Sequence, residues 1–230
     1  YRGYPIEQIA EKSNFTEVMY LLLHGELPST EQFSSFENNI KKYNFVADEL
    51  KKLIDVFPRS AHPMGVLSSL TSALTAFNPK AVDVKSKEEL ELAAELMIAK
   101  FSHLCAWTYR KTNGFPLNHG DNSLNYVENF YKMTFRKPYE EFEIDPVVVA
   151  ALDKLLILHA DHEQNCSTST VRMVGSAHTG LFASISAGVS ALWGPLHGGA
   201  NQAVIEMLEM IEKDGGDVAK YVQKAKDKED

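Results

Sequence analysis

Residues 145–165 read Asp-Pro-Val-Val-Val-Ala-Ala-Leu-Asp-Lys-Leu-Leu-Ile-Leu-His-Ala-Asp-His-Glu-Gln-Asn, and they set the pattern for the whole chain. Asp145 is a typical N-cap residue and Pro146 suits the first turn of a helix, so we predict a helix from Val147 to His159. Apolar side chains fill nearly every position of that run. Because a helix that is apolar all round is a buried helix, we expect protein to surround it on most sides.

The same helical patterning continues on both sides of this run. Ser29 with Gln32 and Ser86 with Glu89 have capping-box spacing, and Gly114 follows the end of the segment that begins at Ser86. No stretch of four or more residues alternates convincingly between apolar and polar side chains as a strand would. We therefore predict an all-α fold, with helices over residues 5–13, 16–24, 29–42, 47–57, 64–77, 86–112, 123–136, 147–159, 167–178, 181–193, 200–211 and 217–226.

Composition places the chain among ordinary globular proteins. Its 230 residues are 44% hydrophobic and 23% charged, and no apolar run reaches the length of a membrane span. The formal net charge of −8 argues against general nucleic-acid binding. Only two cysteines occur, so a disulfide framework is not expected and a reducing compartment such as the cytoplasm is the default.

Polar and ionisable side chains gather where the helix of residues 147–159 ends: His159, Asp161, His162, Glu163 and Asn165. A helix C-terminus carries partial negative charge, which favours a protonated histidine. His162 is then suited to holding an anionic or carbonyl oxygen. Two other interpretations stay open. One is a polar helix end whose histidine serves the last carbonyls, and the other is a metal site in which His159 and His162 share a helix face, although the sequence offers no tidy third ligand.

A second cluster is Gly194-Pro-Leu-His197-Gly-Gly-Ala-Asn201. Gly194 and Pro195 end one apolar helix, and the next helix is predicted to start just after His197. The positive end of that helix favours the neutral form of an imidazole, and a neutral imidazole with a fixed tautomer donates one hydrogen bond to a carbonyl oxygen that becomes enolate-like. The flanking glycines allow a close backbone approach. The alternative interpretation is an ordinary turn that contains a histidine.

Residues between the two clusters are interpreted as structural. Ser167 to Thr170, followed by Arg172, is typical of a capped helix start. Cys166 lies at the same helix start, but the sequence shows no basic partner for a reactive thiol. We therefore expect Cys166 to be a small buried residue.

The two clusters resemble motifs of a known family. His159-Ala-Asp-His162-Glu163-Gln-Asn165-Cys-Ser-Thr-Ser-Thr and Gly194-Pro-Leu-His197-Gly-Gly-Ala-Asn201 are similar to the two large-domain motifs of citrate synthase, in its bacterial hexameric branch. The Gly-Glu-Leu-Pro at residues 25–28 and the Ala-His-Pro-Met at 61–64 are similar in order and spacing as well. The resemblance therefore covers essentially all 230 residues.

The resemblance implies an activity and roles for four residues. Citrate synthase, a transferase of the tricarboxylic acid cycle, condenses acetyl-CoA with oxaloacetate and hydrolyses citryl-CoA to citrate and CoA. By resemblance, His197 is catalytic and donates a hydrogen bond to the thioester carbonyl while the methyl group loses a proton. His162, Asn165 and His159 are implied as substrate-binding residues, with His162 and Asn165 at oxaloacetate. No metal and no cofactor are implied, because acetyl-CoA is a substrate.

The resemblance also implies an organisation for the chain. Residues 1–198 are expected to form part of a large helical domain and residues 199–230 the start of a small one. The chain would then be an internal fragment that lacks the family's N-terminal region and most of its small domain, and it would be inactive alone. Family members are homodimers, which the bacterial branch assembles into hexamers. The helices that look like the dimer-forming set are 86–112, 123–136, 146–159 and 167–178.

Departures from the family pattern leave other functions open. Lys42-Tyr43 stands where NADH-inhibited bacterial relatives have an Arg-His pair, and Tyr139 stands where they have a cysteine, which argues against NADH inhibition. One alternative is 2-methylcitrate synthase, which uses propionyl-CoA through the same chemistry. Another is a non-catalytic, truncated helical module retained for oligomerisation.

Overall fold

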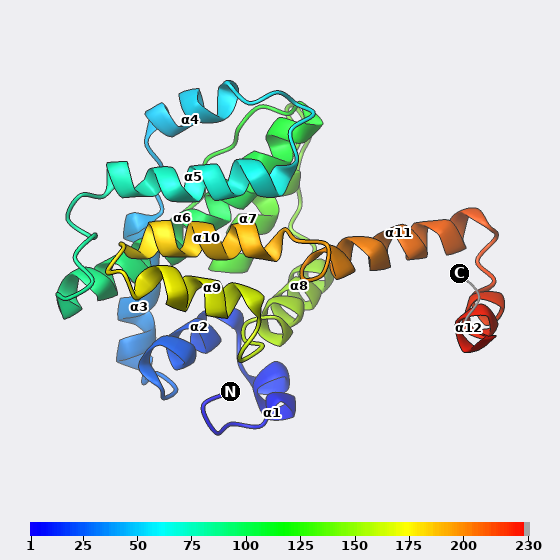
Figure 1. The fold of residues 1–230 in the computed structure, drawn as a ribbon, viewed down its shortest axis with the longest axis horizontal. Coiled ribbons are helices and arrows are strands. Elements are labelled where there is room, and N and C mark those ends of the chain that lie inside the picture. Colours follow the sequence, from blue (N-terminus) through cyan, green and yellow to red (C-terminus); the bar gives the residue numbers. More distant parts are fainter. Residues whose placement is uncertain (228–230) are drawn as a thin grey trace.

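The computed structural model describes residues 1–227, and within that range it contains twelve α-helices and no strand (Figure 1). The predicted all-α fold is therefore confirmed. The helices are α1 (Ile6–Lys12), α2 (Phe15–His24), α3 (Thr30–Tyr43), α4 (Asp48–Asp55), α5 (Pro63–Phe77), α6 (Lys87–Asn113), α7 (Tyr126–Phe135), α8 (Pro146–Leu158), α9 (Cys166–Gly175), α10 (Leu181–Leu192), α11 (Gly199–Lys213) and α12 (Val218–Asp227).

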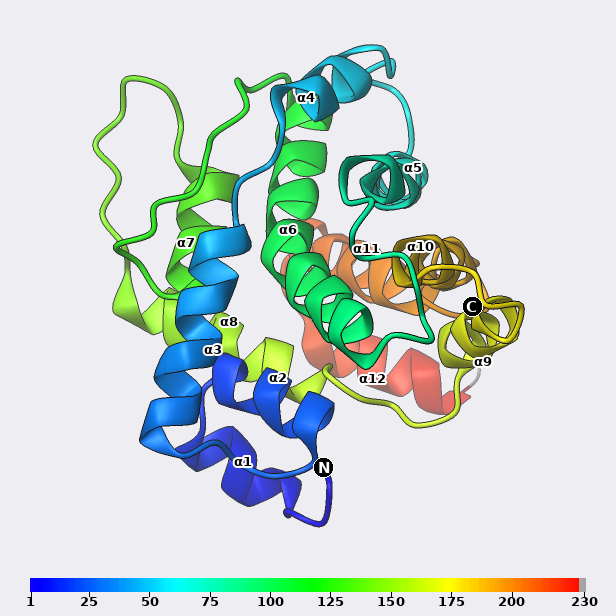
Figure 2. The ribbon, with the colours of Figure 1, turned by 90° about the vertical axis from the view of Figure 1, so that its left-hand side faces the viewer.

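The long helix α6 runs through the middle of the fold. Helices α3 and α7 pack on one side of it and α5 and α10 on the other, with α9 packed against α10 (Figure 2). The main core cluster includes the fully buried side chains of Leu104, Trp107 and Phe182. Burying a large apolar side chain contributes about 1.5–3 kcal/mol, so this cluster holds the layers together. Among the helices within residues 1–227, none combines the length and apolar character needed to cross a bilayer.

Serines join α5 to α10. Ser68 Oγ lies 3.1 Å from Ser186 Oγ and 2.7 Å from Ser190 Oγ, and Ser186 Oγ donates to the backbone carbonyl of Ser68 over 2.8 Å. Small side chains allow two helix backbones to approach closely, and these hydrogen bonds then fix one helix against the other. On the inner face of α5, Leu70 and Leu74 are fully buried.

The two predicted capping boxes, Ser29–Gln32 and Ser86–Glu89, have different outcomes in the structure. At α3 the box is complete, because Ser29 accepts from the backbone N–H of Gln32 and the Gln32 side chain accepts from Ser29 N–H. At α6 only half of the predicted box forms. Ser86 Oγ accepts from the backbone N–H of Glu89, but the Glu89 carboxylate accepts from two backbone N–H groups of the preceding loop instead. Gly114 ends α6 in the left-handed conformation, as predicted.

The prediction that the apolar helix of residues 147–159 is buried on most sides is wrong for α8. One face of α8 packs against α1, α2 and α7, and Ile157 is its one buried residue. The opposite face is open: Val147 is 75% exposed and Leu155 is 53% exposed. Helix α9 buries none of its residues and exposes 74% of Met173. No element within residues 1–227 covers these apolar side chains.

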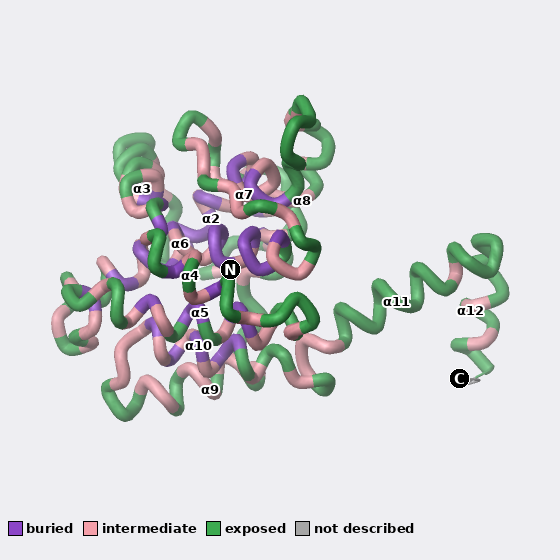
Figure 3. The backbone as a smooth tube through the Cα atoms, turned by 90° about the horizontal axis from the view of Figure 1, so that it is seen from above, coloured by how far each residue is buried: buried purple, intermediate pink, exposed green. Residues whose placement is uncertain are grey.

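Helices α11 and α12 extend away from the other ten (Figures 1 and 3). Neither buries any of its residues, although α11 is amphipathic. Gly215 and Gly216 separate the two helices, and both adopt positive φ. The expected domain boundary between residues 198 and 199 stays a prediction. The last three residues of the expected small-domain segment, 228–230, lie outside the described part of the chain.

A buried arginine ties α6 to the end of α7. The Arg110 guanidinium is fully buried, and its Nη1 donates to the backbone carbonyls of Met133, Thr134 and Arg136 over 3.4, 3.1 and 2.8 Å. Its Nε donates to the carbonyl of Pro116. The last carbonyls of a helix have no partner within the helix, and at the C-terminus of α7 Arg110 satisfies them together with Asn118 Nδ2, which donates to the carbonyls of Met133 and Arg136.

Candidate active site

The two predicted histidine clusters are brought together where α9 begins and α10 ends. His197 Nε2 lies 3.1 Å from Ser167 Oγ in the first turn of α9. Ser167 Oγ in turn lies 2.8 Å from Asn165 Oδ1, the acceptor in that hydrogen bond. A hydrogen-bonded chain therefore links His197, Ser167 and Asn165, residues up to 32 positions apart in the sequence.

Asn165, at one end of this series of hydrogen bonds, is held in place by the backbone. It is the N-cap of α9, and its Oδ1 also accepts a hydrogen bond from the backbone N–H of Thr168 over 2.9 Å. This contact sets the orientation of the amide, since only the oxygen can accept from an N–H. The predicted cap at this helix start therefore comes from Asn165, two residues before the predicted Ser167.

The direction of the hydrogen bonds determines the tautomer of His197. A serine hydroxyl has a single hydrogen. If Ser167 donates it to Asn165, then Ser167 accepts from His197 and the neutral imidazole carries its proton on Nε2. If the hydroxyl turns toward His197, Nε2 is the acceptor and the proton lies on Nδ1. The orientation of one hydroxyl thus controls which ring nitrogen donates.

The turn that carries His197 is tightly built from backbone hydrogen bonds. The N–H of His197 donates to the carbonyl of Gly194 over 2.9 Å, and the N–H of Gly198 donates to the carbonyl of Leu192 over 2.9 Å. A Cβ at Gly198 would lie 2.3 Å from the Leu192 carbonyl oxygen, so no side chain fits there. The predicted close backbone approach is confirmed, and α11 starts at Gly199, just after His197 as predicted.

The other predicted histidines lie apart from His197. His159 is the C-cap of α8, and its Nδ1 lies 2.7 Å from the carbonyl oxygen of Leu155. This contact matches the interpretation of a histidine that serves the last helix carbonyls. The rings of His159 and His162 meet edge to face with centroids 5.9 Å apart, and both are exposed. Within residues 1–227, no hydrogen bond joins either ring to His197, and no three His, Cys, Asp or Glu side chains are grouped to hold a metal ion.

Sequence reasoning missed the role of Ser167 and misplaced Cys166. Ser167 was interpreted only as part of a cap, although it is the one side chain that contacts both His197 and Asn165. Its position between two polar motifs was the available signal. Cys166, expected to be buried, is exposed because α9 lies on the surface with no buried residue.

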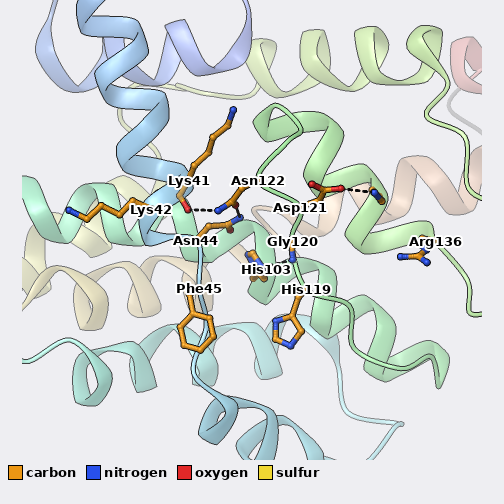
Figure 4. A pocket seen from close by; sticks show the side chains of 11 residues that line it. Lys41, Lys42, Asn44, Phe45, His103, His119, Gly120, Asp121, Asn122 and Arg136 are labelled. Atoms are coloured by element: carbon orange, nitrogen blue, oxygen red, sulfur yellow. Dashed lines mark hydrogen bonds and ion pairs between the residues drawn. The ribbon is translucent and has the colours of Figure 1, made fainter.

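A separate cationic cavity of about 570 Å³ opens between the end of α3, α6 and the loop before α7 (Figure 4). Lys41, Lys42, Lys132 and Arg136 line it, and the one acidic lining residue is Asp121. Lys132 donates to the Asp121 carboxylate over 2.8 Å, and hydrogen bonds from Lys132 and Ser123 lower the pKa of Asp121. Lys42 therefore lines this cavity, and Lys42-Tyr43 is the pair that stands where NADH-inhibited relatives have Arg-His.

A histidine also lines this cavity without adding to its charge. Burial lowers the pKa of His103 to about 4, so its ring is neutral at pH 7. The cavity suits an anion by its charge, but its lining includes none of the residues that contact His197. The candidate active site is therefore the cluster around Ser167.

Comparisons with known proteins identify the family of this chain. A family model described as "Citrate synthase, C-terminal domain" matches residues 1–230. Citrate synthase 1 of Mycobacterium tuberculosis is 54% identical over 229 residues, covering 100% of this chain and 53% of that protein. The citrate synthase of Corynebacterium glutamicum is 49% identical over 231 residues, covering 100% of this chain and 53% of that protein. The chain thus spans about half the length of these curated relatives.

Solved structures show the same fold. The citrate synthase of Pyrobaculum aerophilum aligns with a TM-score of 0.81 at 36% identity, over 91% of this chain and 53% of that one. The citrate synthase of Thermoplasma acidophilum, in a ternary complex with carboxymethyl coenzyme A and oxaloacetate, aligns with a TM-score of 0.83 at 28% identity. The alignment covers 92% of this chain and 54% of that one. Because the family match extends over the whole chain, the chain belongs to the citrate synthase family.

Proposed function

We propose that the complete protein condenses acetyl-CoA with oxaloacetate and hydrolyses citryl-CoA to citrate and CoA. The observation that carries this proposal is the His197 imidazole, held by Ser167 immediately before the start of α11. A thioester methyl is a weak carbon acid, so charge that develops on the carbonyl oxygen needs a preorganised donor. His197 is in place to be that donor, and the T. acidophilum relative was crystallised with a coenzyme A derivative and oxaloacetate.

The contacts of His197 indicate which nitrogen meets the thioester. Nε2 is engaged with Ser167, so Nδ1 is the nitrogen left for substrate. A neutral imidazole that donates from Nδ1 needs an acceptor role at Nε2, so Ser167 must turn its hydroxyl hydrogen from Asn165 to His197. Asn165 then keeps its hydrogen bond from Thr168 N–H. Ser167 thereby stabilises the tautomer that the reaction uses, and it does so without contacting substrate.

Replacing Ser167 with alanine in the complete protein is expected to lower kcat by about 5- to 30-fold, the equivalent of one hydrogen bond of about 1–2 kcal/mol. KM for oxaloacetate should change little, because the Asn165 amide keeps its hydrogen bond from Thr168 N–H. Ser169→Ala is the matched control, since Ser169 is an exposed serine on the same helix. A Ser167→Ala enzyme as active as the Ser169→Ala enzyme would contradict the proposed role.

The activity itself is tested by CoA thiol release. The complete protein should release thiol with acetyl-CoA plus oxaloacetate, and much faster than with propionyl-CoA. A preference for propionyl-CoA would instead identify a 2-methylcitrate synthase. No release with either thioester would favour a non-catalytic oligomerisation module. Residues 1–230 alone are expected to show no turnover, and robust turnover by this segment would defeat that expectation.

We propose that the open faces of α8 and α9 are covered by a second copy of the chain, as part of a dimer or a hexamer built from dimers. The support is the exposed apolar set on these two helices, which includes Val147, Leu155 and Met173. Exposed apolar patches of this kind mark interaction surfaces. Sedimentation equilibrium of the complete protein should give a mass that is an even multiple of one chain, and a monomer would contradict the proposal.

We further propose that His162 and Asn165 bind oxaloacetate and that His159 is a further substrate-binding residue. We also propose that the enzyme acts in the tricarboxylic acid cycle in the cytoplasm without a cofactor or metal. The support for the substrate-binding roles is that all three residues lie in one segment just before Ser167. The support for a reducing compartment is that Cys105 and Cys166 are both free thiols. His162→Ala should raise KM for oxaloacetate more than KM for acetyl-CoA in steady-state kinetics.

A further inference from the structure

The turn that carries His197 is anchored on two sides, and only one of them is the contact with Ser167. The second anchor is Trp193, the C-cap residue of α10, four positions before His197. Its indole stacks on the imidazole of His62 with ring centroids 4.8 Å apart and an angle of 26° between the planes. Residues 131 positions apart in the sequence thus meet face to face at the base of the turn.

His62 is itself held in place. It is the N-cap of α5, and its Nδ1 accepts a hydrogen bond from the backbone N–H of Met64 over 3.2 Å. This contact fixes the ring plane relative to the first turn of α5. The neutral ring then carries its proton on Nε2, and its face is presented to Trp193.

The six-membered ring of the indole also contacts the first turn of α5. A Cβ added at Gly65 would be 3.4 Å from both Cη2 and Cζ3 of Trp193, so a longer side chain there would meet the ring. Farther along the two helices, Ser68, Ser186 and Ser190 fix α5 against α10. The start of α5 and the end of α10 therefore form one rigid base, and the stacked rings stand at its edge.

Trp193 is only partly enclosed. The residue is 45% exposed, and a cavity of about 340 Å³ lies beside it. That cavity separates the start of α5 from the first turn of α11, where Asn201 and Gln202 line it. Without the imidazole, the indole has space to move, and the turn attached to it can move as well.

We propose that His62 is a positioning residue that fixes His197 through the stacked ring of Trp193. The inference rests on the proposed function, because it assigns His62 a role in the same reaction. His62 touches neither the thioester nor His197. It restricts where the turn of residues 193–198 can lie, so it sets the distance between the donor nitrogen and its substrate. A positional error of this kind lowers the rate of the chemical step more than it weakens substrate binding.

Two variants of the complete protein separate this role from helix capping. His62→Asn keeps an oxygen acceptor for the N-cap and removes the ring. His62→Phe keeps an aromatic face and removes the acceptor. If the ring positions His197, His62→Asn should lower kcat by about 3- to 10-fold, in line with the strength of an aromatic pair, with little change in KM for oxaloacetate or in Tm. His62→Phe should keep kcat within about twofold and lower Tm.

A lower kcat in His62→Phe than in His62→Asn would overturn the proposal. If His62 served only as a cap, His62→Phe would be the impaired variant and His62→Asn would behave like the unmodified protein. Equal activity for both variants and the unmodified protein would also overturn it. On the partner ring, Trp193→Phe should be less impaired than Trp193→Leu, because only the former keeps a ring to stack.

NMR signals of the His197 ring test the positioning role without measuring turnover, so this test is separate from the test of the proposed function. The His197 ring signals of 13C-histidine-labelled protein, assigned with His197→Gln, should shift in His62→Asn and stay close to their original positions in His62→Phe. If the complete protein shows no thioester activity, the proposed function fails while these signals still decide whether His62 positions His197. Unchanged signals in His62→Asn would refute the positioning role even in an active enzyme.

Discussion

His197→Ala in the complete protein is expected to lower kcat by about 10² or more, the loss typical of removing a preorganised donor to a developing oxyanion. The imidazole is the only side chain that the turn of residues 194–198 presents to the Ser167 cluster. Alanine leaves the backbone hydrogen bonds of that turn in place, including the one from Gly198 N–H to Leu192, so the fold should persist. The expected loss therefore reports chemistry rather than unfolding.

Steady-state kinetics of CoA release measures this effect. His24→Ala is the control, because His24 is an exposed histidine near the end of α2, outside the Ser167 cluster. Adding Ser167→Ala to His197→Ala should lower kcat little further, since the proposed effect of the serine on kcat runs through the imidazole. An unchanged kcat in His197→Ala would remove His197 from the mechanism.

Arg110→Met should give the largest loss of stability among single substitutions discussed for this chain. The methionine fills the space of the aliphatic stem but leaves the carbonyls of Pro116 and Thr134 without their side-chain donor, and those of Met133 and Arg136 with Asn118 Nδ2 alone. Each unsatisfied buried acceptor costs about 1–3 kcal/mol, so losing the donor to two of them should lower the free energy of unfolding by at least about 2 kcal/mol. The midpoint of urea unfolding followed by circular dichroism measures this change.

Arg110→Lys is the matched control for Arg110→Met. A lysine keeps the charge, but its compact ammonium cannot reach both the Pro116 carbonyl and the end of α7 in the way that the planar guanidinium does. Its unfolding midpoint should therefore lie between those of the unmodified protein and Arg110→Met. A methionine variant with an unchanged midpoint would show that water replaces the guanidinium at no cost.

Local sequence signals predicted the fold well because most of its helices are bounded by local interactions. The pairs Ser29–Gln32 and Asp145–Pro146 and the terminal Gly114 marked helix ends that the structure confirms. The start of α7 was placed three residues too early, at Ser123. Its complete capping box is formed by Asn125 and Glu128, and the helix itself begins at Tyr126.

Local sequence patterns could not predict the contacts between segments that are distant in the sequence. The apolar character of α8 was interpreted as burial, but periodicity cannot show whether the covering surface belongs to the same chain. Ser167 lies 30 positions from His197, and His62 lies 131 positions from Trp193. Only the packing of α9 and α5 against α10 brings each pair together. The histidine motifs could be found from the sequence, while the residues that hold them could not.

The way α11 leaves the body of the molecule has a mechanical consequence. This helix has 15 residues and so is about 22 Å long. It is joined to α10 through Gly198, next to a turn that is fixed on both sides. A rotation of about ten degrees at that joint would displace the far end of α11 by about 4 Å while His197 hardly moves. Any rotation at that joint would therefore move the tip of α11 far more than it moves His197.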